Sequence, residues 1–359
     1  MITGKTVLGA CFHAADESTD PIDTLPPGLL SHVFYAFATI EDGRLTLPPQ
    51  APAHLAALAA RKRVDPGLRT VLSIGGWGAG GFSDAALTPR SRAAFVEQAL
   101  ALADGFDGLD LDWEFPVSGG PAELTHRPED RRNVTLLTEQ LRHGLGPSRL
   151  LVAALPAGRL QTAGPYDPAA SYELAAFADV LDFVNLMTYD FGTGFSATAT
   201  FNAPLAEVAQ DPLEADLRRW NNVIGAVDYY ERHGVPRDKL VLGVPFYGRG
   251  FRVASAGEQA GLYQPQTGTV DVADWRDIKR NLLTDPAWQQ HRHPVARSPW
   301  LFHPDTRTFV SYEDARSVEE RSVFAAGHGL RGVFTWHLAG DDDEHTLLAA
   351  MVSPFRPGV

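Results

Sequence analysis

The chain has 359 residues, of which 44% are hydrophobic, so it can bury one large core or the cores of two smaller domains. Its formal net charge of −13 argues against a nucleic-acid backbone or an anionic membrane surface as a partner. Cys11 is the only cysteine, which excludes an internal disulfide and a thiolate metal cluster.

Strand-like and helix-like segments alternate along the chain. Strands are predicted from short runs of aliphatic and aromatic residues, at 6–12, 30–39, 70–77, 106–116, 150–155, 180–189, 240–247 and 329–336. Helices are predicted from apolar periodicity and from proline, glycine and acidic boundary signals, at 51–63, 89–104, 128–145, 172–178, 222–233 and 318–326. Strands that are nearly all separated by helices predict an α/β fold, a closed (β/α)8 TIM barrel.

The doubly wound alternative lacks its sequence signal. Such a fold needs a glycine-rich phosphate turn after the first strand, and the sequence at 12–16, FHAAD, is not one. The segment between the seventh and eighth strands is too long for a simple connection. We expect residues 252–310 to form a small α+β insertion domain, and residues 1–251 and 311–359 to form the barrel. Aromatic residues supply its apolar material, among them Tyr263, Trp275, Trp288 and Trp300.

The stretch 106–116 has the strongest chemical signal in the chain. Asp110, Asp112 and Glu114 alternate with apolar residues, so a β-strand would place the three acids on one face. Neighbouring carboxylates repel each other and resist desolvation, so at least one should hold a proton near neutral pH. A carboxyl group that holds a proton at a strand end is what a general acid needs.

Two other interpretations of this stretch are open. An acidic edge strand facing water would show the same alternation, although edge strands are seldom flanked by several aromatic residues and a proline. Acids two positions apart could also chelate Mg²⁺ or Ca²⁺. The glycine and glutamate that an EF-hand loop requires at its sixth and twelfth positions are missing here, however.

Residues 107–114, with the sequence DGLDLDWE, resemble the DxxDxDxE signature of glycoside hydrolase family 18, the chitinases and their relatives. The resemblance covers nearly the full chain, because further segments resemble the same family in order, at 73–76, 187–190, 202–205, 243–249, 309–318 and 332–336. It implies hydrolysis of β-N-acetylglucosaminides by substrate-assisted retention, a recognised exception among retaining glycosidases. Glu114 would protonate the leaving oxygen, Asp112 would hold the acetamido N–H, and Asp110 would share charge and a proton with Asp112. Tyr189 would hydrogen-bond the acetamido oxygen.

The resemblance also implies sugar-binding residues at the C-terminal ends of the strands, where barrel enzymes have their sites. Trp336 would form the floor under a distorted sugar, and Met187 and Asp190 would shape the pocket. The substrate-binding residues are expected to be Phe37, Trp77, Met187, Asp190, Tyr247, Arg249 and Trp336. The substrate would be chitin or chito-oligosaccharides, with no metal and no cofactor.

Two places depart from the family pattern. The first strand commonly has an aromatic residue directly after its glycine, where this chain has Ala10, and Phe12 is the candidate to pack behind the acids instead. The loop Phe191–Phe195 lacks the histidine or tryptophan often found after the Tyr-Asp pair. Acceptor-side contacts and chain-length preference are therefore open.

A chitin-binding lectin and an endo-β-N-acetylglucosaminidase acting on N-glycans are the competing functions. Glu114 argues against the lectin, because inactive relatives lose this acid. The insertion argues against the second, because we expect it to stand as one wall of a cleft for linear chitin. The alternative is that its aromatic residues are only the core of a small appended domain.

We expect a soluble monomer with no nucleic-acid or membrane partner. There is no run of about 18 apolar residues that would predict a membrane span. Residues 1–5 lead into a strand-like run without a charged leader and an apolar signal core. The expected location is the cytoplasm, or outside the cell if a leader has been removed.

Overall fold

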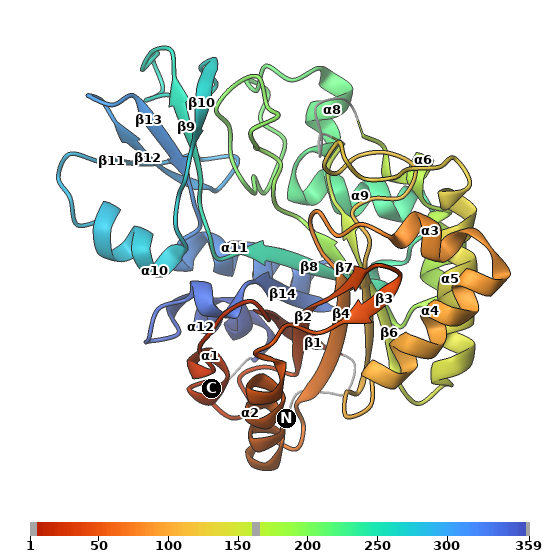
Figure 1. Ribbon diagram of the computed structural model, residues 1–359. Coiled ribbons are helices and arrows are strands. Elements are labelled where there is room, and N and C mark those ends of the chain that lie inside the picture. Colours follow the sequence, from red (N-terminus) through yellow and green to blue (C-terminus); the bar gives the residue numbers. More distant parts are fainter. Residues whose placement is uncertain (1–5, 160–165, 357–359) are drawn as a thin grey trace.

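The computed structural model describes residues 6–159 and 166–356, and its centre is a closed barrel of eight parallel strands (Figure 1). The first barrel strand pairs with both the second and the last, which closes the sheet. In order around the barrel the strands are Val7–His13 (β1), His32–Glu41 (β2), Arg69–Gly75 (β4), Gly108–Asp112 (β5), Leu150–Pro156 (β6), Phe183–Met187 (β7), Leu240–Pro245 (β8) and Gly332–Trp336 (β14). A short strand, Arg44–Thr46 (β3), extends β2 antiparallel.

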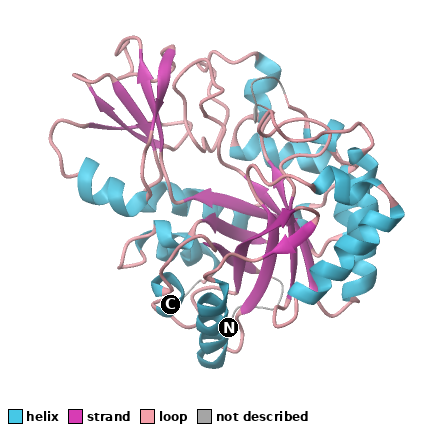
Figure 2. Cartoon of the chain, viewed as in Figure 1, coloured by secondary structure: helices cyan, strands magenta, loops and turns pink. Residues whose placement is uncertain are grey.

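Helices surround the barrel on the outside, so the predicted (β/α)8 fold is confirmed (Figure 2). The longer helices are Ala51–Val64 (α2), Pro89–Leu102 (α4), Asp130–Leu145 (α5), Val223–Arg232 (α9) and Ala315–Gly327 (α11). The shorter helices are Asp20–Asp23 (α1), Phe82–Leu87 (α3), Pro168–Ser171 (α6), Leu174–Val180 (α7), Ala215–Trp220 (α8), Trp275–Asp277 (α10) and Thr346–Val352 (α12). Local signals account for their starts: Thr88 and Ser91 form a capping box at α4, and Asp314 and Ser317 form another at α11.

Two hydrophobic cores follow from the alternation of side chains along the strands. Leu8, Ala10 and Phe12 of β1 belong to the large core between the strands and the helices. Cys11 belongs to the smaller core inside the barrel. The expectation that Phe12 packs behind the acids is therefore wrong: its ring lies 6.0 Å from that of Tyr35, on the outer side of the strand.

A second sheet of five antiparallel strands lies between β8 and β14 in the sequence. Its strands are Arg249–Val253 (β9), Gln266–Val270 (β10), Gln289–Arg292 (β11), Pro299–His303 (β12) and Thr308–Ser311 (β13). In Figure 1 this sheet lies at the upper left, beside the barrel. Phe251, Trp300 and Phe309 pack on Phe201 in a hydrophobic cluster of its own. The domain boundaries at residues 252 and 310 stay a prediction.

Two tryptophans of this segment are core residues. Trp275 and Trp300 are each 6% exposed, and Tyr263 and Trp288 are half-buried. Trp275 stacks on Tyr312 with ring centroids 6.4 Å apart, and Trp300 packs between Phe201 and Phe309. Trp275 belongs to the large core around the barrel and Trp300 to the cluster around Phe201, so these two rings are core residues and not exposed stacking faces. That the segment stands as one wall of a cleft stays a prediction.

In the described ranges 6–159 and 166–356, none of the helices combines the length and the apolar character that a bilayer span needs. The expectation of no leader concerns residues 1–5, which lie outside the described residues.

Candidate active site

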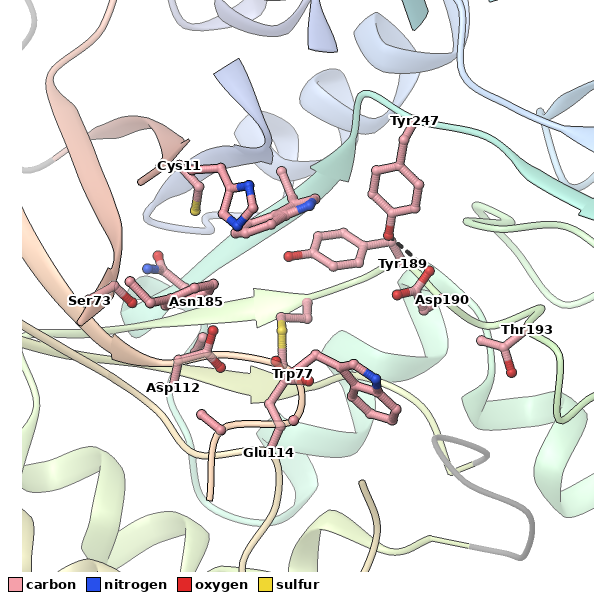
Figure 3. Close-up of a pocket in the computed structure, with 18 of the residues that line it drawn as sticks. Cys11, Ser73, Trp77, Asp112, Glu114, Asn185, Tyr189, Asp190, Thr193 and Tyr247 are labelled. Carbon is pink, nitrogen blue, oxygen red and sulfur yellow. Dashed lines mark hydrogen bonds between the residues drawn. The ribbon is translucent and has the colours of Figure 1, made fainter. Parts of the chain in front are cut away.

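A pocket of about 900 Å³ opens at the C-terminal ends of the barrel strands (Figure 3). Every site residue predicted from the sequence lines this pocket: Asp110, Asp112, Glu114, Tyr189, Phe37, Trp77, Met187, Asp190, Tyr247, Arg249 and Trp336. The segment 252–310 contributes Val272 and Asp274 to the lining, and none of its aromatic residues.

Asp110 and Asp112 are the inward residues of β5, whereas Leu109 and Leu111 face the outer core. The two aspartates are 3% and 5% exposed. The strand ends at Asp112, so Glu114 lies in the turn that follows. The prediction that Glu114 is part of the strand is therefore wrong. The neighbouring strands explain this end, because the pairing with β6 stops at Leu111 and the pairing with β4 stops at Asp112.

Burial favours the neutral form of all three acids. It raises the pKa of Asp110 to about 7, against the hydrogen bond of 2.7 Å that the Ser73 hydroxyl donates to Oδ2. Burial and the charge of Asp190 raise the pKa of Glu114 to about 8. Burial, then the charges of Glu114 and Asp110, raise the pKa of Asp112 well above its ordinary value. Glu114 is therefore neutral near pH 7, and Asp110 and Asp112 together carry less negative charge than two ordinary carboxylates.

Asp190 lies on the opposite side of the pocket, where two side chains hold it. Its Oδ1 accepts hydrogen bonds from the Tyr247 hydroxyl at 2.8 Å and from Arg249 Nε at 2.7 Å. Its backbone N–H donates to Asn202 Oδ1 at 2.9 Å. Figure 3 shows Tyr189 and Tyr247 beside Asp190, and the two phenol rings meet edge to face at 6.1 Å. Asp190 is thus a fixed, paired charge that acts on Glu114.

Flat apolar surfaces complete the pocket. Trp336 and Phe37 stack with their ring centroids 5.5 Å apart and their planes 18° apart. Trp77 is 52% exposed and meets Phe115 edge to face at 6.5 Å. Aromatic faces with a few fixed polar groups suit a ligand that has apolar faces and polar edges.

Sequence reasoning did not identify several lining residues, including Cys11, His13, Ser73, Asn185, Phe195 and Asp274. Asn185 lies two positions before Met187 on β7, so period-two alternation could have identified it. Cys11 faces inward for the same reason, and burial, then Asp110 and Asp112, raise the pKa of its thiol. His13 lies two positions after Cys11 on β1 and follows the same alternation. Asp274 lies in a loop far away in the sequence, for which no local pattern exists.

No three histidine, cysteine or carboxylate side chains in the described part of the chain are arranged to hold a metal ion. The acids, phenols and aromatic faces of the pocket are suited to proton transfer, charge stabilisation and orientation of a bound ring.

The family described as "Glycosyl hydrolases family 18" matches residues 9–341. "Chitinase A1" of Niallia circulans is 36% identical over 296 residues, which is 78% of this chain and 42% of that protein, so the chain spans less than half of that relative. "Chitotriosidase-1" of Mus musculus is 34% identical over 332 residues, 88% of this chain and 68% of that protein. A solved family 18 N-acetylglucosaminidase from Paenibacillus barengoltzii, 29% identical, covers 97% of this chain and 99% of its own with a TM-score of 0.83.

Proposed function

The chain belongs to glycoside hydrolase family 18, and we propose that it is a chitinase that hydrolyses β-1,4-N-acetylglucosaminide bonds with retention of configuration. The observation that supports this most directly is Glu114, whose pKa is raised to about 8, beside the buried pair Asp110 and Asp112. A carboxyl group that is protonated at neutral pH can donate its proton to a leaving oxygen.

The proposed reaction uses the substrate's own acetamido group as the nucleophile. Glu114 gives its proton to the glycosidic oxygen while the C–O bond breaks. The acetamido carbonyl oxygen attacks the anomeric carbon from the other face, which forms a cyclic oxazolinium ion. Water then attacks the anomeric carbon while the bond from this carbon to the acetamido oxygen breaks, which restores the acetamido group, and the Glu114 carboxylate takes the proton of the water. Two inversions give net retention.

The remaining residues stabilise and orient this group. Asp112 accepts a hydrogen bond from the acetamido N–H and stabilises the positive charge, which requires its anionic form. Asp110, with its bond to Ser73, takes part of the shared proton when Asp112 becomes charged. Tyr189, 7% exposed, directs its hydroxyl to the acetamido oxygen. Trp336 lies under the sugar ring, and Met187, Asp190, Tyr247, Arg249, Phe37 and Trp77 line the sites around it.

Chromogenic glycosides of chitobiose and chitotriose, set against an N-glycosylated protein, test the substrate class. The proposal expects release of the chromophore and no release of N-glycans. Efficient N-glycan release would favour the endo-β-N-acetylglucosaminidase, and binding of chito-oligosaccharides without cleavage would favour the lectin. Glu114 in the pocket supports hydrolysis over binding alone.

Cellulose oligomers and fully deacetylated chitosan test the nucleophile. Neither has an acetamido group, so neither should be cleaved, and thiazoline analogues of the intermediate should inhibit. Efficient hydrolysis of a glucose polymer would require an enzyme carboxylate as nucleophile and would contradict the mechanism.

A further inference from the structure

Trp336 is enclosed by three aromatic rings, two of which are histidines. Phe37 stacks on it, and the ring centroids of His13 and His337 each lie 5.6 Å from that of the indole. His13 ends β1, and His337 directly follows β14. The position of the indole therefore depends on how these two imidazole rings are held.

Carboxylates lie on both sides of the His337 ring. Its side chain is 12% exposed, and its Nε2 lies 3.4 Å from Oδ2 of Asp274. Its Nδ1 lies 3.9 Å from Oδ2 of Asp16, whose other oxygen lies 3.6 Å from Nδ1 of His13. Asp16 belongs to the turn after β1, whereas Asp274 belongs to the segment 252–310. One histidine thus joins the barrel to the inserted segment at the edge of the pocket.

The contact between His337 and Asp16 brings a ring nitrogen and a carboxylate oxygen toward each other. His337 Nδ1 and Asp16 Oδ2 are both buried, and neither has a hydrogen-bond partner among the described residues. The two carboxylates face different nitrogens of the ring, and the imidazolium form donates from both. The side chains around His337 are thus the two carboxylates of Asp16 and Asp274 and the imidazole ring of His13.

Backbone hydrogen bonds hold Asp274 against the same strand ends. The Trp275 N–H donates to the Phe246 carbonyl at 2.8 Å, and the Phe246 N–H donates to the Trp336 carbonyl at 2.8 Å. The Asp274 carboxylate is therefore held in register with the strand that bears Trp336.

We propose that His337 is a positioning residue, held by Asp274 and Asp16, that fixes the Trp336 ring beneath the bound sugar. This inference rests on the proposed function of the pocket as a sugar site. It gives the segment 252–310 a part in substrate binding through one carboxylate, although none of its aromatic residues lines the pocket.

Equilibrium binding of chitotetraose, in a Glu114→Gln background that prevents cleavage, tests the proposal. His337→Ala and Asp274→Ala should each raise Kd by roughly tenfold, and Asp274→Asn, which can still accept a hydrogen bond, should recover part of the loss. Asp271→Ala is the matched control, because it removes an exposed acid of the same segment outside the pocket and should leave Kd unchanged.

A double-mutant cycle separates positioning from direct contact. If Asp274 acts through His337, Asp274→Ala should have no further effect on Kd in a His337→Ala background. Independent, additive losses would mean that Asp274 binds the sugar itself, and would overturn the proposal.

The indole N–H resonance of Trp336 gives a readout that needs no substrate. Trp336→Phe identifies it among the resonances of the seven tryptophans. Asp274→Ala and His337→Ala should both shift this resonance, and Asp271→Ala should not. An unmoved resonance in both variants would overturn the proposal, whereas a shifted resonance in a protein that binds no chitotetraose would reject the proposed function and keep the positioning role. Should His337→Ala fail to fold, Asp274→Ala, at a 34% exposed side chain, decides the same question.

Discussion

The acids of the pocket differ in what surrounds each carboxyl group. Asp110 accepts a hydrogen bond from Ser73, which favours its anion against burial. Glu114 lies past the end of β5 and faces the charge of Asp190. Burial and a like charge both favour a neutral carboxyl group, so Glu114 keeps its proton into the neutral range. This is the state that a general acid needs before it meets its substrate.

Glu114→Gln should lower kcat/KM on unactivated chito-oligosaccharides by about 10²–10⁴-fold, because the amide is not acidic enough to transfer a proton to the leaving oxygen. Its melting temperature should not fall, since glutamine has a similar size and does not ionise in the pocket. Glu123→Gln, at an exposed acid outside the pocket, is the control and should keep full activity. A Glu114→Gln enzyme with most of its activity would remove Glu114 from the mechanism.

The pH dependence follows from the same residue. Glu114 must be protonated to act, and its pKa is about 8, so kcat/KM should fall as the pH rises through about 8. Asp190→Asn removes a charge that helps to raise this pKa, so the alkaline limb of the profile should move to lower pH. The rate itself should also fall, because Asp190 binds Tyr247 and Arg249, and the position of the limb is the measurement. A limb that stays in place or moves upward would mean that Asp190 has no electrostatic effect on the acid.

At the scale of elements, the end of β4 determines where the backbone of β5 lies. Gly75 has φ +121°, and the Gly76 N–H donates to the Asp112 carbonyl at 2.9 Å. A Cβ added at Gly75 would lie 2.0 Å from that carbonyl oxygen. The close approach of the two strand ends thus requires a glycine at this position.

Gly75→Ala should destabilise the fold by about 2–6 kcal/mol, from backbone strain and a clash that pushes Asp112 away. Gly78→Ala is a matched control, because Gly78 also has positive φ, +83°, but an added Cβ meets its nearest atom only at 3.9 Å. It should show the strain alone, about 1–3 kcal/mol. Denaturant unfolding and kcat/KM are measured for both variants. Equal losses in the free energy of unfolding would show that the clash with Asp112 is relieved at no cost.

At the scale of the whole molecule, a buried ion pair joins the barrel to the second sheet. Arg321 of α11 and Glu313 have fully buried side chains, and Arg321 Nη1 lies 2.8 Å from Glu313 Oε2. Arg321 also donates to the Ala203 carbonyl, in the segment after β7, and to the Ser298 hydroxyl beside β12 at 2.9 Å. One guanidinium group therefore connects three parts of the chain that are distant in sequence.

Arg321→Met should lower stability by about 3–5 kcal/mol when Glu313 is charged, because it leaves a buried carboxylate without its partner. Burial already raises the pKa of Glu313 to about 7, against the charge of Arg321. A carboxyl group with a raised folded-state pKa stabilises the fold at low pH, and this contribution is lost as the pH rises through that pKa. The variant should therefore lose more stability at pH 8.5 than at pH 5, measured by urea unfolding.

Glu313→Gln added to Arg321→Met is the control for this dependence, because the amide does not titrate. The extra loss at pH 8.5 should disappear in the double variant. Equal losses of the single variant at both pH values would show that Glu313 does not respond to the missing charge.

Local patterns in the sequence determined the elements and the faces of the barrel strands. Alternation along β5 indicated that Asp110 and Asp112 share the inward face, and the strand and helix signals gave the barrel, because both depend on residues a few positions apart. Every predicted site residue lines the pocket, and all of them except Phe37 and Trp77 belong to family motifs, which lie where strands end.

Only the tertiary structure decided features that depend on distant partners. β5 ends where its pairing with β4 and β6 stops, at Asp112 and Leu111. Glu114 therefore lies past the strand, although the alternation predicted that it would be part of it. Trp300 is a core residue because the second sheet formed around it, and Trp275 is one because it packs into the large core beside Tyr312, although their sequence alone fits a binding surface equally well. His13, Asp16, Asp274 and His337 meet around Trp336 from four places in the chain. Such contacts arise from packing between elements, which no periodicity within one element encodes.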